Sequence, residues 1–342
     1  STSLSLFIIT FAAIITLFME KTELIKRPIA QEMLTFREVF DASLNTSNPL
    51  LSEILGYIRR RSGKMMRPML TLLVAKSFGP LSPAAYHAAA TLEMLHTASL
   101  VHDDVVDESD ERRGQPSVNS AYDNKVSVLV GDYLLSTSLY HAALTGDAEI
   151  VRVVAQLGQD LSEGEILQLS NISSSSLSED TYYEIIRKKT AVLFATCAQL
   201  GAMASGASAA DTERFRLFGE KVGICFQIKD DIFDYYESPE LGKPTGNDML
   251  EGKLTLPAIY AVNTSADDHI RDLVKRVKSG HVTHDEIVEL IRFTKAHGGI
   301  EYAMQAMEKL RREALDLILP VQDDDIRTAL EAFLSYVVER TK

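Results

Sequence analysis

Apolar residues recur every three or four positions from about Gln31 to the end of the chain, and this spacing constrains the fold most. It aligns apolar side chains along one face of a helix, whereas the period-two alternation of half-buried strands is rare here. The chain has no fixed-period repeat and no linker-like stretch. We therefore expect a single-domain, all-α bundle of about 12–13 helices. Predicted helices cover 30–43, 50–61, 67–78, 83–109, 118–145, 148–170, 178–205, 208–237, 253–263, 267–279, 283–297, 299–319 and 323–340.

Prolines and glycines mark the ends of several predicted helices. Pro68 and Pro83 stand where a first helical turn tolerates proline, and Gly114–Pro116 ends a long helix. The segments 173–178 and 237–252 are predicted loops. The second is rich in Gly, Pro and polar residues and is long enough to form a lid.

Composition excludes some classes of protein. The 342 residues carry a net charge of -13, which argues against nucleic-acid binding because that requires a basic surface. Cys197 and Cys225 lack the spacing of a zinc or redox site. We expect them to be buried thiols in a reducing compartment, the cytoplasm.

The segment Leu4–Met19 is almost uninterruptedly apolar. It is short for a spanning helix, which needs about 20 apolar residues, and it lacks the basic leading region of a signal peptide. A non-native or upstream extension and a membrane-associating helix fit it equally well, and a packed core helix fits less well. We therefore separate residues 1–19, an apolar extension, from a domain at 20–342, and expect membrane contact either through residues 4–19 or during product release.

Two DDxxD triplets carry the chemistry: Asp103, Asp104 and Asp107, and Asp230, Asp231 and Asp234. Positions i and i+4 share a helix face with Cβ atoms about 5–6 Å apart, and two carboxylates there repel by about 3 kcal/mol at an effective dielectric near 20. A solvated acidic face would explain one isolated triplet. Here both triplets lie in helices that look mostly buried, so we predict a cation that offsets the repulsion.

The predicted cation is Mg²⁺. Carboxylate oxygens without His or Cys suit this hard ion, which shares its coordination shell with substrate phosphates. A calcium loop would need alternating ligands and a central Gly, which neither triplet has. Two such helices facing each other would hold a diphosphate through bridging metals and stabilise its departing charge.

Basic residues near the triplets are candidates for binding phosphate. Lys64 and Arg67 precede a helix start, where backbone N–H groups also favour anions. Arg112 and Arg113 follow the first triplet, although alone they would be read as charges at a helix end. Each of the remaining candidates is weak by itself, and they are Lys189–Thr190, Asp248 and Lys253.

Taken together, the order of these motifs resembles the trans-isoprenyl diphosphate synthases, or polyprenyl synthetases. The matching pieces lie between about residue 25 and the end of the chain, and within the family they are most similar to bacterial synthases of long quinone side chains. The apolar start has no counterpart in the usual pattern. The pieces are Gly63–Pro68 (GKxxRP), His102–Gly114 (DDxxD then RRG), Gly131–Asp132, Lys189–Thr190, Phe226–Asp234 (FQxxDD) and Gly246–Lys253 (GND…EGK).

The resemblance implies the isoprenoid synthase fold, with helices around a central substrate cavity, and a homodimer. It implies about three Mg²⁺ ions per site, with Asp103, Asp107 and Asp230 as main ligands and Asp104, Asp231 and Asp234 binding directly or through water. Arg112, Lys189 and Lys253 would hold the allylic diphosphate. Isopentenyl diphosphate would be held by Lys64, Arg67, His96 and Arg113.

The implied reaction needs no side-chain nucleophile. Ionisation of the allylic diphosphate leaves a cation, the isopentenyl double bond attacks it, and a proton is eliminated. Gln227 and Thr190 could face the cation, although helix packing explains them nearly as well, and His96 could be a core histidine.

Small residues at Ala98 and Ser99 bear on product length. They lie about one helical turn, roughly 5.4 Å, before Asp103, and aromatic residues there stop chain growth in the family. We expect a product longer than C20, with the floor of the tunnel at Met94, Leu95, Leu135, Leu139 or Tyr140. Close helix packing would also explain the two small residues.

Three alternatives stay open to test. A short-chain synthase would make C15 or C20 products. A class I terpene cyclase would need neither the second triplet nor Lys64 and Arg67. A non-catalytic subunit of a heteromeric synthase commonly lacks carboxylates or the paired arginines, which are intact here.

Overall fold

The computed structural model describes residues 13, 17, 19–236 and 245–340. Most of the apolar segment 4–19 and residues 237–244 of the predicted lid lie outside these described residues. The division at residues 19 and 20 therefore stays a prediction.

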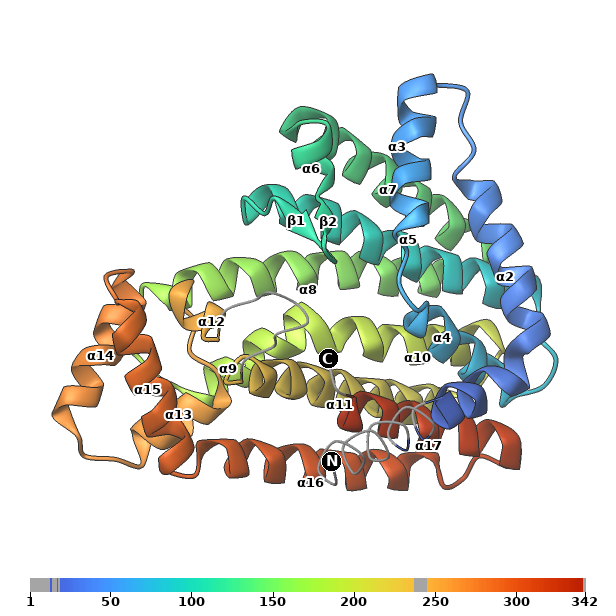
Figure 1. Ribbon diagram of the computed structural model, residues 1–342. Coiled ribbons are helices and arrows are strands. Elements are labelled where there is room, and N and C mark those ends of the chain that lie inside the picture. Colours follow the sequence, from blue (N-terminus) through green and yellow to red (C-terminus); the bar gives the residue numbers. More distant parts are fainter. Residues whose placement is uncertain (1–12, 14–16, 18, 237–244, 341–342) are drawn as a thin grey trace, which may run out of the picture. The chain divides into compact units, whose positions relative to one another are not determined.

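The described chain is built almost entirely from helices, which confirms the all-α prediction (Figure 1). A two-stranded antiparallel hairpin joins β1 (Glu111–Arg112) to β2 (Gln115–Pro116). The helices are η1 (Arg27–Ile29), α2 (Ala30–Ser43), α3 (Pro49–Arg60), α4 (Met66–Lys76), α5 (Pro83–Val106), α6 (Val118–Ala121), α7 (Asn124–Leu144), α8 (Ala148–Ile172), α9 (Glu179–Ile186), η2 (Arg187–Ala191), α10 (Val192–Ala204), α11 (Ala209–Phe233), α12 (Asn247–Leu250), α13 (Leu256–Asn263), α14 (Asp268–Ser279), α15 (His284–Ala296), α16 (Gly299–Ile318) and α17 (Asp324–Glu339).

Most predicted helices differ from the observed ones by up to four residues at an end, and three differ in the structure that lies within or directly after them. The segment 83–109 ends at Val106, and a hairpin rather than a bare helix end follows it. The segment 118–145 is two helices, because the Asp123 side chain caps a new start by accepting from Val126 N. The segment 178–205 contains a π-helical turn at Arg187–Ala191. Apolar periodicity does not register such local changes in hydrogen bonding.

Contacts group the chain into two compact units, each made of separate segments. Unit 1 comprises residues 1–158, 193–219 and 317–336, and unit 2 comprises residues 159–192, 220–316 and 337–342. Each unit contains one of the two triplets.

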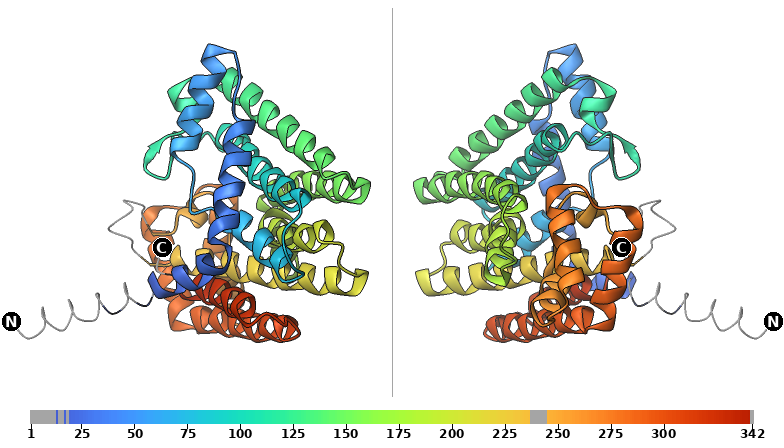
Figure 2. Two further views of the ribbon diagram at one scale, coloured as in Figure 1. Left: turned by 90° about the vertical axis from the view of Figure 1, so that its right-hand side faces the viewer. Right: turned by 90° about the vertical axis from the view of Figure 1, so that its left-hand side faces the viewer.

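The core of unit 1 includes α4, whose residues Pro68–Ala75 are all buried. Thr71 Oγ1 donates to Cys197 O of α10 at 3.0 Å. A Cβ at Gly201 would lie 2.5 Å from Thr71 O, so glycine is required for this close approach. In the same unit α5 and α7 lie side by side (Figures 1 and 2).

In unit 2, α13 contacts α15 and the start of α16. A Cβ at Gly299 would lie 2.4 Å from Pro257 O, so this junction also requires glycine. Tyr260 and Tyr302 stack with ring centroids 4.0 Å apart. The α15 start is fixed by a capping box between Thr283 and Glu286.

Across the described residues, no helix combines the length and the apolar character needed to cross a membrane.

Candidate active site

The first triplet lies at the C-terminal end of α5. Asp103 is in the last turn, and Asp107 is the residue that caps the helix, its N–H bonded to Asp103 O at 2.8 Å. A helix C-terminus carries partial negative charge, so carboxylates there are unfavourable unless a cation is present. Asp103 is half-buried and Asp107 is exposed.

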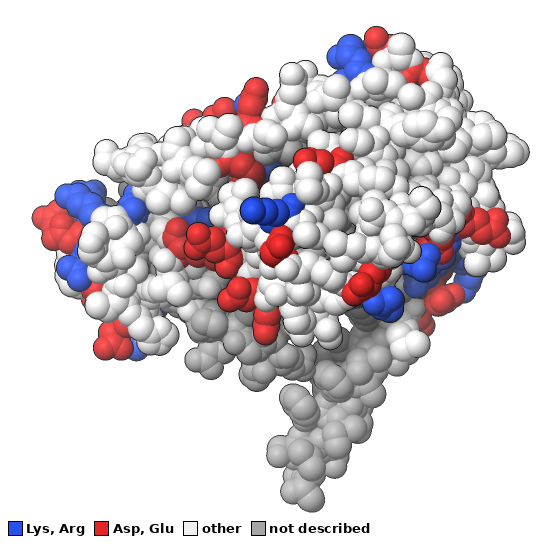
Figure 3. Space-filling model, turned by 90° about the horizontal axis from the view of Figure 1, so that it is seen from above, with Lys and Arg blue, Asp and Glu red and all other residues white. Residues whose placement is uncertain are grey.

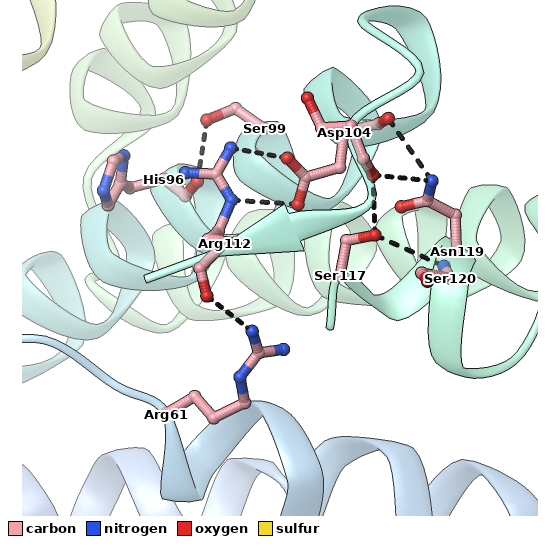
Figure 4. A network of polar contacts seen from close by, with 9 residues as sticks. Arg61, His96, Ser99, Asp104, Arg112, Ser117, Asn119 and Ser120 are labelled. Atoms are coloured by element: carbon pink, nitrogen blue, oxygen red, sulfur yellow. Dashed lines mark hydrogen bonds and ion pairs between the residues drawn. The ribbon is translucent and has the colours of Figure 1, made fainter. Parts of the chain in front are cut away.

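The middle aspartate of this triplet points into the protein. Asp104 is 4% exposed and accepts two hydrogen bonds from Arg112, from Nε at 2.9 Å and from Nη2 at 2.8 Å (Figure 4). The hairpin carries Arg112 into this position, and Arg61 Nη2 donates to its carbonyl at 2.7 Å. A forked pair of this kind is a strong charge-assisted contact. Arg112 is therefore not a helix-end charge, as it would be read alone.

The GKxxRP motif packs against Arg113. A Cβ at Gly63 would lie 2.6 Å from Arg113 Nη1, so a larger residue here would displace the Arg113 guanidinium. Arg113 and Met65 both have left-handed backbones, with φ of +52° and +57°. Such strain in non-glycine residues is concentrated at functional sites.

The other two predicted cations of unit 1 contact aromatic rings. Lys64 Nζ donates to Tyr336 Oη at 2.7 Å, and the Arg67 guanidinium lies 4.9 Å from the centre of the Phe194 ring. These contacts hold both long side chains in defined positions.

His96 lies on α5 beside a pocket of about 70 Å³. Burial lowers the pKa of His96 well below its usual value, and the charges of Arg67, Arg113 and Arg112 lower it further. Burial raises the pKa of Glu93 to about 7, although Arg67 and Arg113 oppose the shift. Apolar side chains line part of this pocket, among them Phe40, Leu44, Met94, Leu100, Val101 and Leu134, and charged side chains line another part: Arg59, Arg61, Asp104, Arg112 and Arg113.

The predicted chain-length residues lie on the same helix. Ala98 is buried, and Ser99 is half-buried with its hydroxyl donating to His96 O at 2.7 Å. Of the predicted floor residues, Met94 and Leu95 are buried, and Met94 lines the pocket. The other three, Leu135, Leu139 and Tyr140, are exposed in this chain.

Gly131 and Asp132 of α7 both lie close to the side chain of His102 on α5. A Cβ at Gly131 would lie 2.2 Å from Nε2 of His102, the residue that precedes the first triplet. Asp132 Oδ1 lies 3.3 Å from the same nitrogen. Glycine and aspartate here therefore fix the position of α7 against the end of α5.

The second triplet, in unit 2, repeats the geometry of the first. Helix α11 ends at Phe233, and Asp234 follows directly, its N–H bonded to Asp230 O at 3.3 Å. Asp234 Oδ1 and Oδ2 accept from the backbone N–H groups of Asn247 and Asp248 at 3.1 and 3.2 Å. This carboxylate thus holds the start of α12, which belongs to the GND…EGK segment.

Asp231, the middle aspartate, is 5% exposed and is held by neutral partners. Tyr182 Oη donates to Oδ2, and Gln227 Nε2 donates to Oδ1 at 2.9 Å. Thr190 Oγ1 in turn donates to Gln227 Oε1 at 2.8 Å. Burial raises the pKa of Asp231 well above its usual value, and the charge of Asp248 raises it further.

Lys189 and Thr190 lie in the π-helical turn, a feature common at functional sites. Lys189 Nζ contacts Glu165 Oε1 at 3.0 Å and Gln168 Oε1 at 2.6 Å. A Cβ at Gly164 would lie 3.0 Å from Lys189 N, so glycine lets α8 approach the turn.

A pocket of about 140 Å³ in unit 2 brings together several of these residues. Lys253 pairs with Glu251 at 2.8 Å beside it. Burial and, next, the charge of Asp234 raise the pKa of Asp248 to about 7. The polar lining includes Tyr182, Lys189, Gln227, Asp231, Asp248 and Lys253.

Sequence reasoning missed three partners of the predicted residues. Arg340 pairs with Asp230 and stacks on Phe226, with its guanidinium 3.9 Å from the ring centre. Tyr182 and Tyr336 were overlooked as well. They lie 49 residues from Asp231 and 272 from Lys64, so nothing local in the sequence indicates these contacts.

The donor set of the triplets fits a hard divalent cation. All candidate ligands are carboxylate oxygens, each triplet lies at the negative end of a helix, and in unit 2 the neighbouring charges of Asp234 and Asp248 are mutually unfavourable. Within the described part of the chain, the side chains form no ready-made cluster of three or more His, Cys, Asp or Glu that could hold a metal.

Comparisons with known proteins agree with these motifs. A family model for polyprenyl synthetase matches residues 48–292. The octaprenyl diphosphate synthase of Escherichia coli (strain K12) is 32% identical over 321 residues, which cover 94% of this chain and 99% of that protein.

Solved structures are similar over nearly the whole chain. A geranylgeranyl pyrophosphate synthase from Bacteroides thetaiotaomicron has 52% identity and a TM-score of 0.83, covering 94% of this chain and 100% of its own. A polyprenyl synthase from Caulobacter crescentus CB15, complexed with calcium and isoprenyl diphosphate, has 29% identity and a TM-score of 0.86, with coverages of 93% and 98%.

Proposed function

The chain belongs to the polyprenyl synthetase family, and from this premise we propose how its residues carry out the reaction. It is a trans-polyprenyl diphosphate synthase, which condenses isopentenyl diphosphate with an allylic diphosphate. The observation that carries the proposal is the repeated geometry of the triplets, each at a helix C-terminus with basic side chains in the same unit.

The metal ligands in this proposal are the outer aspartates, Asp103 and Asp107 in unit 1 and Asp230 and Asp234 in unit 2. Asp104 and Asp231 are buried and hydrogen-bonded, so they position the helix ends instead. When bound, Mg²⁺ supplies Lewis-acid stabilisation of the departing diphosphate. The calcium-bound Caulobacter relative supports a divalent cation.

Basic residues divide between the substrates. In unit 1, Lys64, Arg67 and Arg113 bind the diphosphate of isopentenyl diphosphate, and neutral His96 orients it by hydrogen bonding. In unit 2, Lys189 and Lys253 bind the allylic diphosphate. Arg112, which the family resemblance assigns to the allylic diphosphate, holds Asp104 of its own unit through Nε and Nη2.

The covalent step then follows. The allylic C–O bond breaks and diphosphate leaves with the electron pair, the isopentenyl double bond forms the new C–C bond, and a proton is lost to the released diphosphate. Gln227 is held between Thr190 and Asp231, so its amide is fixed for orientation toward the developing cation.

The expected product is longer than C20, because Ala98 and Ser99 are small and apolar side chains line part of the pocket beside His96. The octaprenyl relative supports this length. The second candidate is a C20 product, which the 52% identity to a geranylgeranyl synthase favours.

One experiment separates the two candidates. The purified protein is incubated with labelled isopentenyl diphosphate, several allylic primers and Mg²⁺, and the dephosphorylated products are separated by chromatography. Products beyond C20 support the long-chain proposal, and accumulation at C20 selects the second.

The variant Ala98→Phe should shorten the product while Ser99→Ala leaves it unchanged, and an unchanged length in Ala98→Phe would reject the role of Ala98.

We also propose a homodimer formed through α7. This helix exposes a series of large apolar side chains, which are expected to be covered in a stable protein. On the face drawn in Figure 3, charged side chains form small separate groups of both signs. Light scattering of wild type and of Leu129→Glu tests the interface, and an unchanged dimer in the variant would reject it. The exposed residues are Val128, Leu129, Leu135, Leu139, Tyr140 and Leu144.

A further inference from the structure

Two histidines and a serine meet in unit 1, away from both triplets. His87 comes from α5, His141 from α7, and Ser43 is the last residue of α2. The Nδ1 atoms of the two imidazoles are 3.1 Å apart, and Ser43 Oγ lies 2.6 Å from His141 Nε2. The reaction proposed above uses none of these residues.

The hydrogen bonds fix the tautomer of His141. Ser43 donates its hydroxyl to Val39 O at 2.7 Å, so its Oγ accepts from His141 Nε2–H. His141 Nδ1 then carries a lone pair, and it faces His87 Nδ1. Metal-binding histidines show this arrangement, in which one ring nitrogen binds the ion and the other donates to a fixed partner.

The separation of the two nitrogens suits one shared ion. Zinc lies about 2.0–2.1 Å from imidazole nitrogen, so an ion equidistant from two nitrogens 3.1 Å apart subtends an angle of about 95–100°. This angle falls between those of square-planar and tetrahedral coordination. Without an ion, the two nitrogens must share one proton.

The surroundings provide access and room for further ligands. His141 is 6% exposed, whereas His87 is half-buried and, in the single chain, lines an open hollow of about 620 Å³ together with Tyr133, Thr137 and Tyr140, of which Tyr140 belongs to the dimer face proposed above. Burial lowers the pKa of His141 to about 4 and also lowers that of His87. Both rings are therefore neutral at physiological pH, the form that binds metals.

We propose that His87 and His141 bind one divalent transition-metal ion of the zinc class through their Nδ1 atoms, with water completing the shell. The site joins α2, α5 and α7. It is chemically distinct from the carboxylate sites, because imidazole nitrogen suits zinc and copper whereas Mg²⁺ prefers oxygen. It does not depend on the proposed function.

The test uses the full chain without a histidine tag, after chelator treatment and with Cu²⁺ as a spectroscopic probe. We expect one Cu²⁺ per chain, with electron paramagnetic resonance showing two nitrogen ligands. His87→Gln, at a half-exposed position, should weaken binding at least tenfold, and Ser43→Ala about tenfold through loss of His141 orientation. Zn²⁺ should raise the Tm of the wild type but not that of His87→Gln.

The matched control is the double variant His281→Ala/His284→Ala, which removes two exposed histidines three positions apart. It should bind Cu²⁺ as the wild type does. Equal affinity in wild type and His87→Gln, or loss of the ion in the control, would overturn the proposal.

Discussion

The two triplets have the same sequence pattern and the same place at a helix end, yet their middle aspartates are stabilised in different ways. In unit 1, Asp104 is paired with the charged guanidinium of Arg112. In unit 2, Asp231 is held by the neutral donors Tyr182 and Gln227. The buried carboxyl group of the same motif can therefore be stabilised either by a charged guanidinium or by neutral hydrogen-bond donors.

The first aspartates of the two triplets are alike in their exposure. Successive residues of a helix are rotated by about 100°, so the first aspartate of each triplet points away from the buried second one. Asp103 and Asp230 are both half-buried. The comparison therefore predicts similar results for the outer positions and different results for the middle ones.

The largest effect is expected at the outer positions. Asp103→Asn or Asp230→Asn removes a charge from the proposed Mg²⁺ ligands, and kcat should fall by about 10²–10³. Half-maximal activity should also require more Mg²⁺. Steady-state kinetics over a Mg²⁺ titration measures both, with Asp272→Asn on the exposed face of α14 as the control. Full activity in either variant would contradict the proposal for that triplet.

The next effect separates the middle positions. Arg112→Ala leaves the buried Asp104 without its charged partner, and the free energy of unfolding should fall by about 3 kcal/mol. Urea unfolding measures this loss. The double variant Asp104→Asn/Arg112→Ala should recover part of it, because no buried charge remains. A loss in Arg112→Ala below about 0.5 kcal/mol, as at an ordinary surface position, would show that the pair does not stabilise unit 1.

The sequence predicted the long helices because their apolar periodicity extends over many residues. The segment 30–43 coincides with α2, and 148–170 differs from α8 by two residues at one end. The hairpin at Glu111–Pro116 and the π-helical turn at Arg187–Ala191 were not predicted. Each involves only a few residues and depends on what packs against it, such as Gly164 against Lys188.

The candidate site residues could be chosen from motifs, but their contacts could not. Asp104 and Asp107 are equivalent letters of DDxxD, yet one is buried and the other exposed. The pairing of Asp104 with Arg112 depends on the hairpin, and that of Asp230 with Arg340 depends on a residue 110 positions away. Three-dimensional packing, and not local spacing, decides these partners.

A third prediction concerns Glu93, a second buried acid of unit 1 that lies near the charges of Arg67 and Arg113. Its pKa rises from 4.5 to about 7 on folding, so between these values the folded chain holds a proton that the unfolded chain has lost. The free energy of unfolding therefore decreases as pH rises from about 4.5 to about 7. From pH 5 to pH 8 the wild type should lose about 2 kcal/mol more than Glu93→Gln, which cannot ionise.

Urea unfolding at a series of pH values measures the Glu93 effect. Groups other than Glu93 titrate in both proteins, so the difference between their pH profiles isolates this carboxyl. Parallel profiles would mean that Arg67 and Arg113 keep Glu93 ionised in the folded state, and that unit 1 balances its second buried acid by charge as well.

The smallest effect is expected in unit 2. Tyr182→Phe removes one neutral hydrogen bond to Asp231 but leaves the bond from Gln227, so the free energy of unfolding should fall by about 1 kcal/mol, less than in Arg112→Ala. Because Asp231 holds Gln227, kcat should decrease while KM for both substrates stays near the wild-type value. Tyr236→Phe, at an exposed position, is the control and should change neither quantity. An equal loss of stability in Tyr182→Phe and Arg112→Ala would contradict this. Asp231 would then depend on one partner as much as Asp104 does, and the two triplets would not differ in how they hold the middle aspartate.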